Sequence, residues 1–395
     1  MDYMKKLNIP MSLPDITDLE REAVAGVMQT NFLSMGPCVQ EFEDAIRTFT
    51  GSKHAIAVSS GTAGLHICVR TAGWQDNDWV ITTPFSFVSS ANVLLYERIT
   101  PIFVDVDPAT GNIDPQQVEQ AASDISSSLE KAQKWLPPRG FSAQEKIKGI
   151  LAVDVFGQPA DYDPLRRTAD AFGIQLIEDS CESLGAKYKS RNAGTLADFG
   201  VFAFYPNKQI TTAEGGMVVT DNDAYADMLY ALRNQGRAPG DTWLEHTYLG
   251  YNYRMDELSA ALGAAQMKRV QTLVAARQQV ADWYESELQD IQGISGPQTA
   301  ETTTRSSWFV YVIRLDHGID RKKVIDQLQE LGVPTRPYFS PIHFQPYMME
   351  RFGYQKGQFP VTEDLGARGL ALPFSGKMTL EQVQETAAAL RQVLV

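Results

Sequence analysis

The sequence of 395 residues is poor in cysteine and histidine, and it contains no long hydrophobic run. Its three cysteines, Cys38, Cys68 and Cys181, are far apart and form no Cys-x-x-Cys pair, so neither a disulfide framework nor a zinc site is expected. The five histidines are equally scattered, and we expect no metal site. The longest apolar runs, such as residues 149–156, are far shorter than the ~20 residues that cross a membrane. Since the N-terminus also lacks the apolar region of a signal peptide, we expect a cytoplasmic protein.

Positive charge is also scarce. The 35 lysines and arginines are outnumbered by 48 aspartates and glutamates, which gives a formal net charge of −13 at pH 7. Because no basic stretch offsets this charge, neither a nucleic acid nor an anionic membrane is an expected partner. The fingerprints Gly-x-Gly-x-x-Gly and Gly-x-x-x-x-Gly-Lys-Ser/Thr are both absent, which argues against nicotinamide-dependent and P-loop enzymes.

Short β-branched or aromatic segments alternate with stretches of helical period over the first half of the chain. The segments predicted as strands are residues 55–58, 79–82, 102–106, 150–155, 174–177, 201–204 and 217–220. This alternation indicates an α/β fold with a mostly parallel sheet and helices on both faces. In such folds, ligands bind beyond the carboxyl ends of the strands.

The second half of the chain has a different pattern. A long helix is predicted over residues 256–288, and the segments after it suggest a smaller α+β domain. Those segments are a strand at 308–314 and helices at 321–331 and 379–394. The sequence therefore predicts a large domain over residues 1–270 and a small C-terminal domain over residues 271–395.

Two local features complete this organisation. Thr17-Asp-Leu-Glu20 has the spacing of a capping box and predicts a helix that ends near residue 29. The polar stretch 121–148 contains Pro137-Pro138 and Gly140, and we interpret it as a surface insertion.

Two segments that follow predicted strands carry groups suited to an anionic cofactor. Ser59-Ser-Gly-Thr-Ala63 opens a helix, where backbone N–H groups and hydroxyls favour a phosphate. Asp179 ends another strand, where a carboxylate can keep a pyridine nitrogen protonated. Taken alone, each segment is more often a plain helix cap.

The segment from Phe202 to Gly216 is the most specific. A single lysine, Lys208, follows an aromatic strand and precedes Gly215-Gly216. An isolated lysine of this kind is usually a solvated loop residue. The order of phosphate turn, strand-end aspartate and lysine in a glycine-flanked turn favours instead a lysine that forms a Schiff base.

These motifs resemble those of the DegT/StrS family of sugar-nucleotide aminotransferases, which depend on pyridoxal 5′-phosphate (PLP). The similarity covers nearly the whole chain and implies the type I PLP-dependent aminotransferase fold. The matching stretches are Leu33-Ser-Met-Gly-Pro37, Ser60-Gly-Thr62, Pro84-Phe-Ser-Phe87, Gly157-Gln-Pro-Ala-Asp161, Glu178-Asp179, Lys208, Glu214-Gly-Gly216, Gly250-Tyr-Asn-Tyr-Arg-Met255 and Leu372-Pro373.

The resemblance implies a role for each matching residue. Lys208 would bind the cofactor covalently and, once displaced, act as the base, and Asp179 would pair with the pyridine nitrogen. Gly61 and Thr62 would hold the phosphate, and Phe87 would stack on the ring, although for Phe87 alone a core aromatic is the simpler interpretation.

The resemblance also implies partners. Asn252 would reach the phosphate of the neighbouring subunit's cofactor, so a homodimer with shared active sites is expected. L-glutamate is the expected amino donor and a nucleotide-linked keto sugar the acceptor. Ser34, Met35, Arg336 and Tyr338 are candidate substrate-binding residues.

Two positions depart from the family pattern. Ala203 stands where a serine often donates to the phosphate, which puts one phosphate contact in doubt. Glu182 stands where Gln or His is frequent, and a glutamate facing the phenolate-like ring oxygen would repel it unless protonated. Glu182 together with Arg336-Pro-Tyr-Phe339 is more similar to the branch of GDP-perosamine synthase, which aminates C4 of a 4-keto-6-deoxy sugar.

Three alternatives remain open on the sequence. The acceptor could be a 3-keto rather than a 4-keto sugar. A 3-dehydrase of the same family is disfavoured because that branch replaces the lysine by histidine, whereas this chain has Lys208. A catalytically silent relative with a regulatory role is disfavoured by the intact Asp179 and Lys208.

Overall fold

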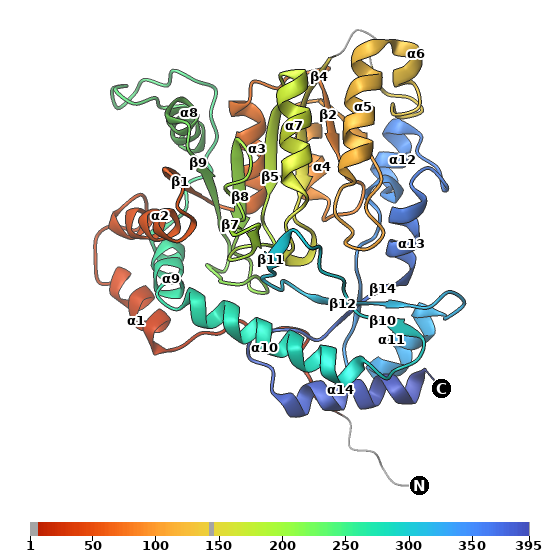
Figure 1. Cartoon of the computed structure of the whole chain (residues 1–395). Helices are drawn as coiled ribbons and strands as arrows, with labels where there is room; N and C mark the ends of the chain where they lie inside the picture. Colours follow the sequence, from red (N-terminus) through yellow and green to blue (C-terminus); the bar gives the residue numbers. More distant parts are fainter. Residues whose placement is uncertain (1–6, 142–145, 395) are drawn as a thin grey trace.

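The computed structural model describes residues 7–141 and 146–394 and is built around a central sheet of seven strands (Figure 1). Their order across the sheet is β1-β9-β8-β5-β4-β2-β3. Five of them, β8, β5, β4, β2 and β3, run parallel, whereas β9 is antiparallel to both of its neighbours. The strands are β1 (His54–Val58), β2 (Trp79–Thr82), β3 (Thr100–Phe103), β4 (Ile147–Val153), β5 (Gln175–Asp179), β8 (Phe199–Ala203) and β9 (Gly216–Thr220). All seven correspond to predicted strands, and the prediction of a mostly parallel sheet is confirmed.

Helices cover both faces of the sheet. Alternate strand residues point to opposite sides, and the side chains on both sides are apolar, so each face packs against helices. Ile56 and Val58 face a core shared with α3, α4 and α8, whereas Ala55 and Ala57 face α2 and α9. Farther along the sheet, α5 and α7 cover the second face. The helices are α2 (Pro37–Thr50), α3 (Gly61–Thr71), α4 (Ser89–Tyr96), α5 (Pro115–Ser127), α7 (Tyr162–Phe172), α8 (Asp223–Arg233) and α9 (Glu257–Met267).

A second sheet of four strands, in the order β10-β12-β14-β13, belongs to the C-terminal part. Its strands are β10 (Ile294–Ser295), β12 (Tyr311–Leu315), β13 (Arg336–Pro337) and β14 (Gly369–Leu372), and its helices are α10 (Val270–Leu288), α11 (Arg321–Glu330), α12 (Pro346–Phe352), α13 (Pro360–Arg368) and α14 (Leu380–Val393). Ile9, near the start of the chain, is buried in this core with residues of α10 and α14. The division of the chain at residue 270 stays a prediction.

The remaining elements are short. Strands β6 (Lys187–Tyr188), β7 (Arg191–Asn192) and β11 (Thr303–Arg305) form a small antiparallel sheet in the order β11-β6-β7. Helix α1 (Asp18–Val27) begins at the predicted capping box, in which the Thr17 backbone N–H donates to Glu20 Oε2 at 2.7 Å. The turns η1 (Val155–Gly157) and η2 (Ile342–Phe344) and the helix α6 (Leu129–Ala132) connect larger elements.

The prediction of one long helix over residues 256–288 was wrong in one respect, because the helix is interrupted between α9 and α10. Arg269 leaves the helical region, with φ −116° and ψ 3°. Its guanidinium forms ion pairs with Glu20 at 2.8 Å and with Asp15 at 3.1 Å. These contacts tie the break to the N-terminal segment, while the Arg269 backbone N–H donates to the Gln266 carbonyl oxygen at 3.0 Å.

The prediction of a surface insertion over residues 121–148 was wrong at both ends, because its first residues belong to α5 and residues 147–148 belong to β4. Ala121 and Ala122 lie within α5 and are fully buried, as is Ala132 in α6. The strand predicted from residue 308 begins only at Tyr311, since Trp308 has a positive φ of 52°. Residues 142–145 of the predicted insertion lie outside the described residues.

None of the described helices has the length and hydropathy to cross a membrane. Within residues 7–141 and 146–394, no three His, Cys, Asp or Glu side chains are grouped so that they could hold a metal ion.

Candidate active site

A cavity of about 460 Å³ lies at the carboxyl ends of three neighbouring parallel strands. Val153, Asp179 and Ala203 are the last residues of β4, β5 and β8, and all three line it. Register pairs Asp179 with Val153 on one side and with Val201 on the other. The topology therefore provides the ligand position that the sequence pattern predicted for an α/β sheet.

One wall of the cavity is the N-terminus of α3. The Ser60 Oγ caps this helix and accepts a hydrogen bond from the Ala63 backbone N–H at 3.0 Å. Gly61 is packed so closely that a Cβ there would come within 2.7 Å of the Ala203 Cβ and 2.9 Å of the Cys181 Sγ. Thr62 Oγ1 donates to Ser89 Oγ at 3.0 Å, which links α3 to the start of α4. The result is a hollow lined by helix N–H groups and hydroxyls, suited to an anion.

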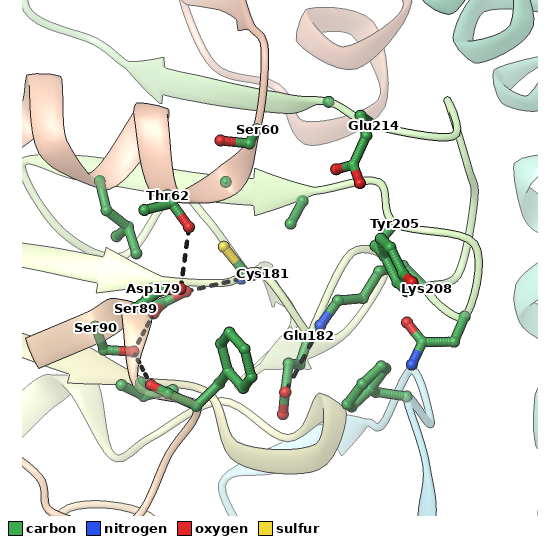
Figure 2. Close-up of a pocket in the computed structure, with 18 of the residues that line it drawn as sticks. Ser60, Thr62, Ser89, Ser90, Asp179, Cys181, Glu182, Tyr205, Lys208 and Glu214 are labelled. Carbon is green, nitrogen blue, oxygen red and sulfur yellow. Dashed lines mark hydrogen bonds and ion pairs between the residues drawn. The ribbon is translucent and has the colours of Figure 1, made fainter. Parts of the chain in front are cut away.

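Asp179 is almost fully buried and is held from two directions. Its Oδ2 accepts a hydrogen bond from Ser90 Oγ at 2.7 Å, and its Oδ1 accepts one from the Cys181 backbone N–H at 3.2 Å. Both donors fix the orientation of the carboxylate inside the cavity, as Figure 2 shows for Ser90.

Lys208 points into the same cavity toward Glu182 (Figure 2). Its Nζ lies 3.6 Å from Glu182 Oε1 and 3.7 Å from the centre of the Phe309 ring. Burial raises the pKa of the Glu182 carboxyl, and the nearby Lys208 ammonium and the Phe156 backbone N–H, which donates to Oε2 at 2.9 Å, reduce that rise. Glu182 is thus a carboxyl that takes up a proton more readily than an exposed glutamate.

The loop that carries Lys208 is fastened by buried side chains from elsewhere in the chain. Arg277 of α10 donates to the backbone carbonyl oxygens of Asn207 at 2.9 Å and Lys208 at 2.5 Å. Gln209 Nε2 donates to the Glu182 carbonyl oxygen at 2.5 Å. This hydrogen bond connects the loop that carries Lys208 to the backbone of Glu182. Burial lowers the pKa of Arg277 to about 10, which still leaves it charged at neutral pH.

The structure brings together most of the predicted cofactor residues. Seven of the predicted site residues line the cavity: Gly61, Thr62, Phe87, Asp179, Glu182, Lys208 and Tyr338. Phe87 is 63% exposed and lies at the mouth, so it is not the core aromatic that the simpler interpretation suggested.

Four predicted residues lie elsewhere in this chain. Ser34 and Met35 are exposed on the loop after α1, where Ser34 pairs with Asp256. Arg336 is exposed on β13, and Asn252 is exposed on a segment that pairs with Asn234. Within the described chain, none of the four lines the cavity.

Sequence reasoning missed several residues that line the cavity. Ser90 follows the Pro84–Phe87 motif by three residues, and its hydroxyl at a helix start was the available signal. Asn207 directly precedes Lys208, and its buried Oδ1 has no hydrogen-bond partner among the described residues. Phe309 lies 101 residues beyond Lys208, so only the tertiary structure could place it beside the amine.

Comparisons with known proteins identify the family of the chain. A profile of the DegT/DnrJ/EryC1/StrS aminotransferase family matches residues 14–391. GDP-perosamine synthase of Caulobacter vibrioides is 34% identical over 391 residues, covering 98% of each chain. Spore coat polysaccharide biosynthesis protein SpsC of Bacillus subtilis is 32% identical over 399 residues, covering 98% of this chain and 97% of that one. Helicobacter pylori PseC, an aminotransferase of pseudoaminic acid biosynthesis, superposes with a TM-score of 0.88 at 26% identity, covering 98% of this chain and 99% of that one.

The residues of the cavity fit PLP chemically. The N-terminus of α3 at Gly61 lines the cavity and offers N–H donors for a phosphate, Asp179 offers a buried carboxylate, and Lys208 offers an amine. Since a family profile spans nearly the whole chain, the predicted family, fold and cofactor are confirmed. The chain belongs to the DegT/DnrJ/EryC1/StrS family, has the type I PLP-dependent aminotransferase fold, and is a PLP-dependent sugar aminotransferase.

Proposed function

We propose that this protein transfers the amino group of L-glutamate to a nucleotide-linked 4-keto-6-deoxy sugar, giving a nucleotide-linked amino sugar. The observation that carries the proposal is the cavity in which Lys208, Glu182 and Asp179 converge. The similarity to GDP-perosamine synthases, 34% and 31% identical, supports the class of acceptor.

In this proposal PLP, when bound, supplies the electron sink of transamination. Lys208 holds the cofactor covalently and, once released, moves a proton to or from the substrate carbon. Asp179 holds a negative charge at the pyridine nitrogen, and its hydrogen bonds from Ser90 and Cys181 keep the carboxylate oriented. Phe87, at the mouth of the cavity, presents an apolar ring to one face of the cofactor.

The N-terminus of α3 binds the phosphate through its backbone N–H groups and Thr62. Ala203 offers no hydroxyl, so this chain lacks the contact that a serine supplies in many relatives. The Ala203 methyl group instead packs against Gly61, at the place where a side chain on residue 61 would lie. This packing narrows the phosphate-binding hollow. Glu182, in its protonated form, donates a hydrogen bond to the ring oxygen, and its raised pKa supports this role.

We also propose that the active unit is a homodimer in which each cavity is completed by the partner. Several large apolar side chains are strongly exposed, and exposure of this kind is typical of interaction surfaces. They are Met28, Phe32, Leu33, Trp243, Leu244 and Leu249. Asn252 is exposed three residues after Leu249, so it can reach a second copy but not its own cavity.

We propose substrate contacts for two sets of residues, those that line the cavity and those that are exposed near the proposed dimer interface. Tyr338 lies in the cavity, and Arg336 lies two residues away on β13, where a cation can meet a diphosphate. Ser34 and Met35 lie on the exposed loop with Leu33, so we propose that they act from the partner subunit.

The test is an assay of purified holoenzyme with L-glutamate and a panel of 3-keto and 4-keto nucleotide sugars, with the new amine located by NMR. Amination of C4 in a 6-deoxy sugar is the expected result. Amination at C3 would support the alternative acceptor class, and turnover with another amino donor would remove glutamate from the proposal. The absence of any cofactor absorbance in protein incubated with PLP would favour a silent relative.

A further inference from the structure

Two fully buried carboxyl groups are next in sequence to residues that line the cavity, Val153 and Asp179. Asp154 follows β4 and Glu178 lies in β5, and neither side chain is exposed to solvent. Neither forms an ion pair with a lysine or arginine of the described chain. Ser180 lies between them, with its Oγ 2.9 Å from Asp154 Oδ2 and 2.8 Å from Glu178 Oε1.

The two contacts of the Ser180 hydroxyl, one with each carboxyl, need two protons. Two ionised carboxylates and one serine hydroxyl supply only one. A serine hydroxyl has one O–H to donate, and its other contacts must be accepted bonds. If both carboxyls were ionised, Ser180 could donate to only one of them, and its oxygen would face the other without a proton between them. Burial raises the pKa of both carboxyls, and their mutual repulsion favours the uptake of a proton by one of them.

The backbone N–H groups around the two carboxyls indicate which one holds this proton. Both oxygens of Glu178 accept backbone N–H groups, Oε1 from Gly194 at 2.5 Å and Oε2 from Leu196 at 2.8 Å. A proton on either oxygen would weaken a bond that is already made. Asp154 differs, because among residues 7–141 and 146–394 its Oδ2 meets only the hydroxyls of Ser180 and Ser183, which can accept as well as donate. Its Oδ1 accepts from the Ala160 N–H and the Tyr162 hydroxyl.

We propose that Asp154 carries a proton in the folded protein, shares it through Ser180 with the carboxylate of Glu178, and so fixes the turn that positions Asp179 and Glu182. The turn is short, since Asp179 precedes Ser180 directly and Glu182 precedes Ser183, whose hydroxyl contacts Asp154 Oδ2 at 2.7 Å. The Asp154 backbone N–H also donates to the Asp179 carbonyl oxygen at 3.0 Å. Asp154 is thus a positioning residue, and its effect on the cofactor rests on the roles proposed above for Asp179 and Glu182.

The proton can be observed without the cofactor. Infrared spectra of the apoprotein at neutral pH should contain a protonated-carboxyl C=O band that moves when aspartate carboxyl carbons are labelled with ¹³C. The band should disappear in Asp154→Asn. If no aspartate-sensitive band is found, or if Asp154→Asn leaves it unchanged, the proposal is wrong whatever the roles of Asp179 and Glu182.

Matched variants separate the two carboxyls. In Asp154→Asn the amide NH₂ can donate to both serine hydroxyls while the amide oxygen keeps the bonds from Ala160 and Tyr162, so the unfolding midpoint of the apoprotein should stay near wild type. Glu178→Gln makes the same carboxyl-to-amide replacement but sets an NH₂ against the backbone N–H of Gly194 or Leu196, so it should lower that midpoint or prevent folding. The reverse order would place the proton on Glu178, and equal effects would show that the backbone N–H groups do not exclude it from Glu178; either result would overturn the proposal.

The positioning role has its own measurement. Asp154→Asn should leave the pH at which the absorbance of the bound cofactor changes close to wild type, whereas Asp154→Ala should shift it and lower kcat/KM by about a hundredfold, the loss expected from a misplacement of about 1 Å. If Asp154→Ala folds with an unchanged absorbance titration, the cluster stabilises the protein without positioning Asp179 and Glu182, and that part of the proposal fails. If wild-type protein binds PLP through another lysine, the proposed function fails instead, while the apoprotein measurements stand.

Discussion

At the residue scale, the cavity is defined by how a few ionisable side chains are held. Lys208 lies between a carboxyl that favours protonation and an aromatic ring, and its loop is fastened by Arg277. Asp179 receives two hydrogen bonds that fix its carboxylate. Such fixed geometry reduces the reorganisation needed during the reaction.

Lys208→Ala should abolish transamination, because it removes the amine that binds the cofactor and the base that moves the proton. The purified wild-type protein should be yellow, and borohydride should fix the cofactor to the peptide that contains Lys208. Lys268→Ala is the control, since Lys268 forms an exposed pair with Glu41 at 3.0 Å on the surface. Labelling of a different lysine, or full turnover by Lys208→Ala, would contradict the assignment.

Glu182→Gln should make the stability of the apoprotein less dependent on pH. The pKa of Glu182 is higher in the folded protein than the ordinary value of 4.5, so the folded state binds more protons than the unfolded state above pH 4.5. Stability therefore falls as pH rises from 4.5 through the raised pKa, and glutamine cannot ionise to produce this loss. The difference in unfolding midpoint between variant and wild type should grow in favour of the variant across that window.

The same variant tests the contact with the cofactor. Glu182→Gln keeps a hydrogen-bond donor at the ring oxygen while removing a titrating group, so the pH titration of cofactor absorbance should change. An unchanged titration would place Glu182 away from the cofactor.

At the scale of elements, the site depends on the close approach of the end of β8 to the start of α3. Gly61→Ala should weaken PLP binding at least about tenfold, or 1.4 kcal/mol, because the new methyl group would come within 2.7 Å of the Ala203 Cβ and narrow the phosphate hollow. Titration of the apoprotein with PLP measures this change. Gly26→Ala in α1 is the matched control, since a Cβ there meets no atom of the described part of the chain within 4 Å. Equal affinities for both variants would show that the phosphate binds elsewhere.

At the scale of the whole molecule, the proposed dimer predicts complementation between two defective chains. Asn252→Asp should weaken cofactor binding by placing a carboxylate against the partner's phosphate, and Lys208→Ala should abolish chemistry separately. A mixed dimer would contain one cavity with an intact Lys208 and an intact Asn252 from opposite chains. Refolding the two variants together should therefore restore activity that neither shows alone. If mixed dimers form without activity, Asn252 does not act across the interface.

The sequence by itself determined the fold class, the cofactor and the order of the cofactor-binding segments. The fold class followed because strand and helix periods are local properties, and the position of Asp179 followed because it ends a strand of a parallel sheet. The cofactor followed from the resemblance of the ordered motifs, including the loop that carries Lys208, to those of a known family. The predicted residues at the ends of β5 and α3 accordingly line one cavity.

Only the tertiary structure decided which distant side chains hold these residues in place. Phe309, Arg277 and Gln209 have no local signal, because their contacts join residues far apart in the sequence, and those of Phe309 and Arg277 depend on how the C-terminal part packs against the large sheet. The ion pairs that Arg269 forms at the helix break likewise depend on the position of the N-terminal segment, which helix propensity does not record. The buried cluster of Asp154, Ser180 and Glu178 is a property of two adjacent strands and the turn after one of them, so its hydrogen bonds, and the proton they require, follow from the three-dimensional arrangement alone.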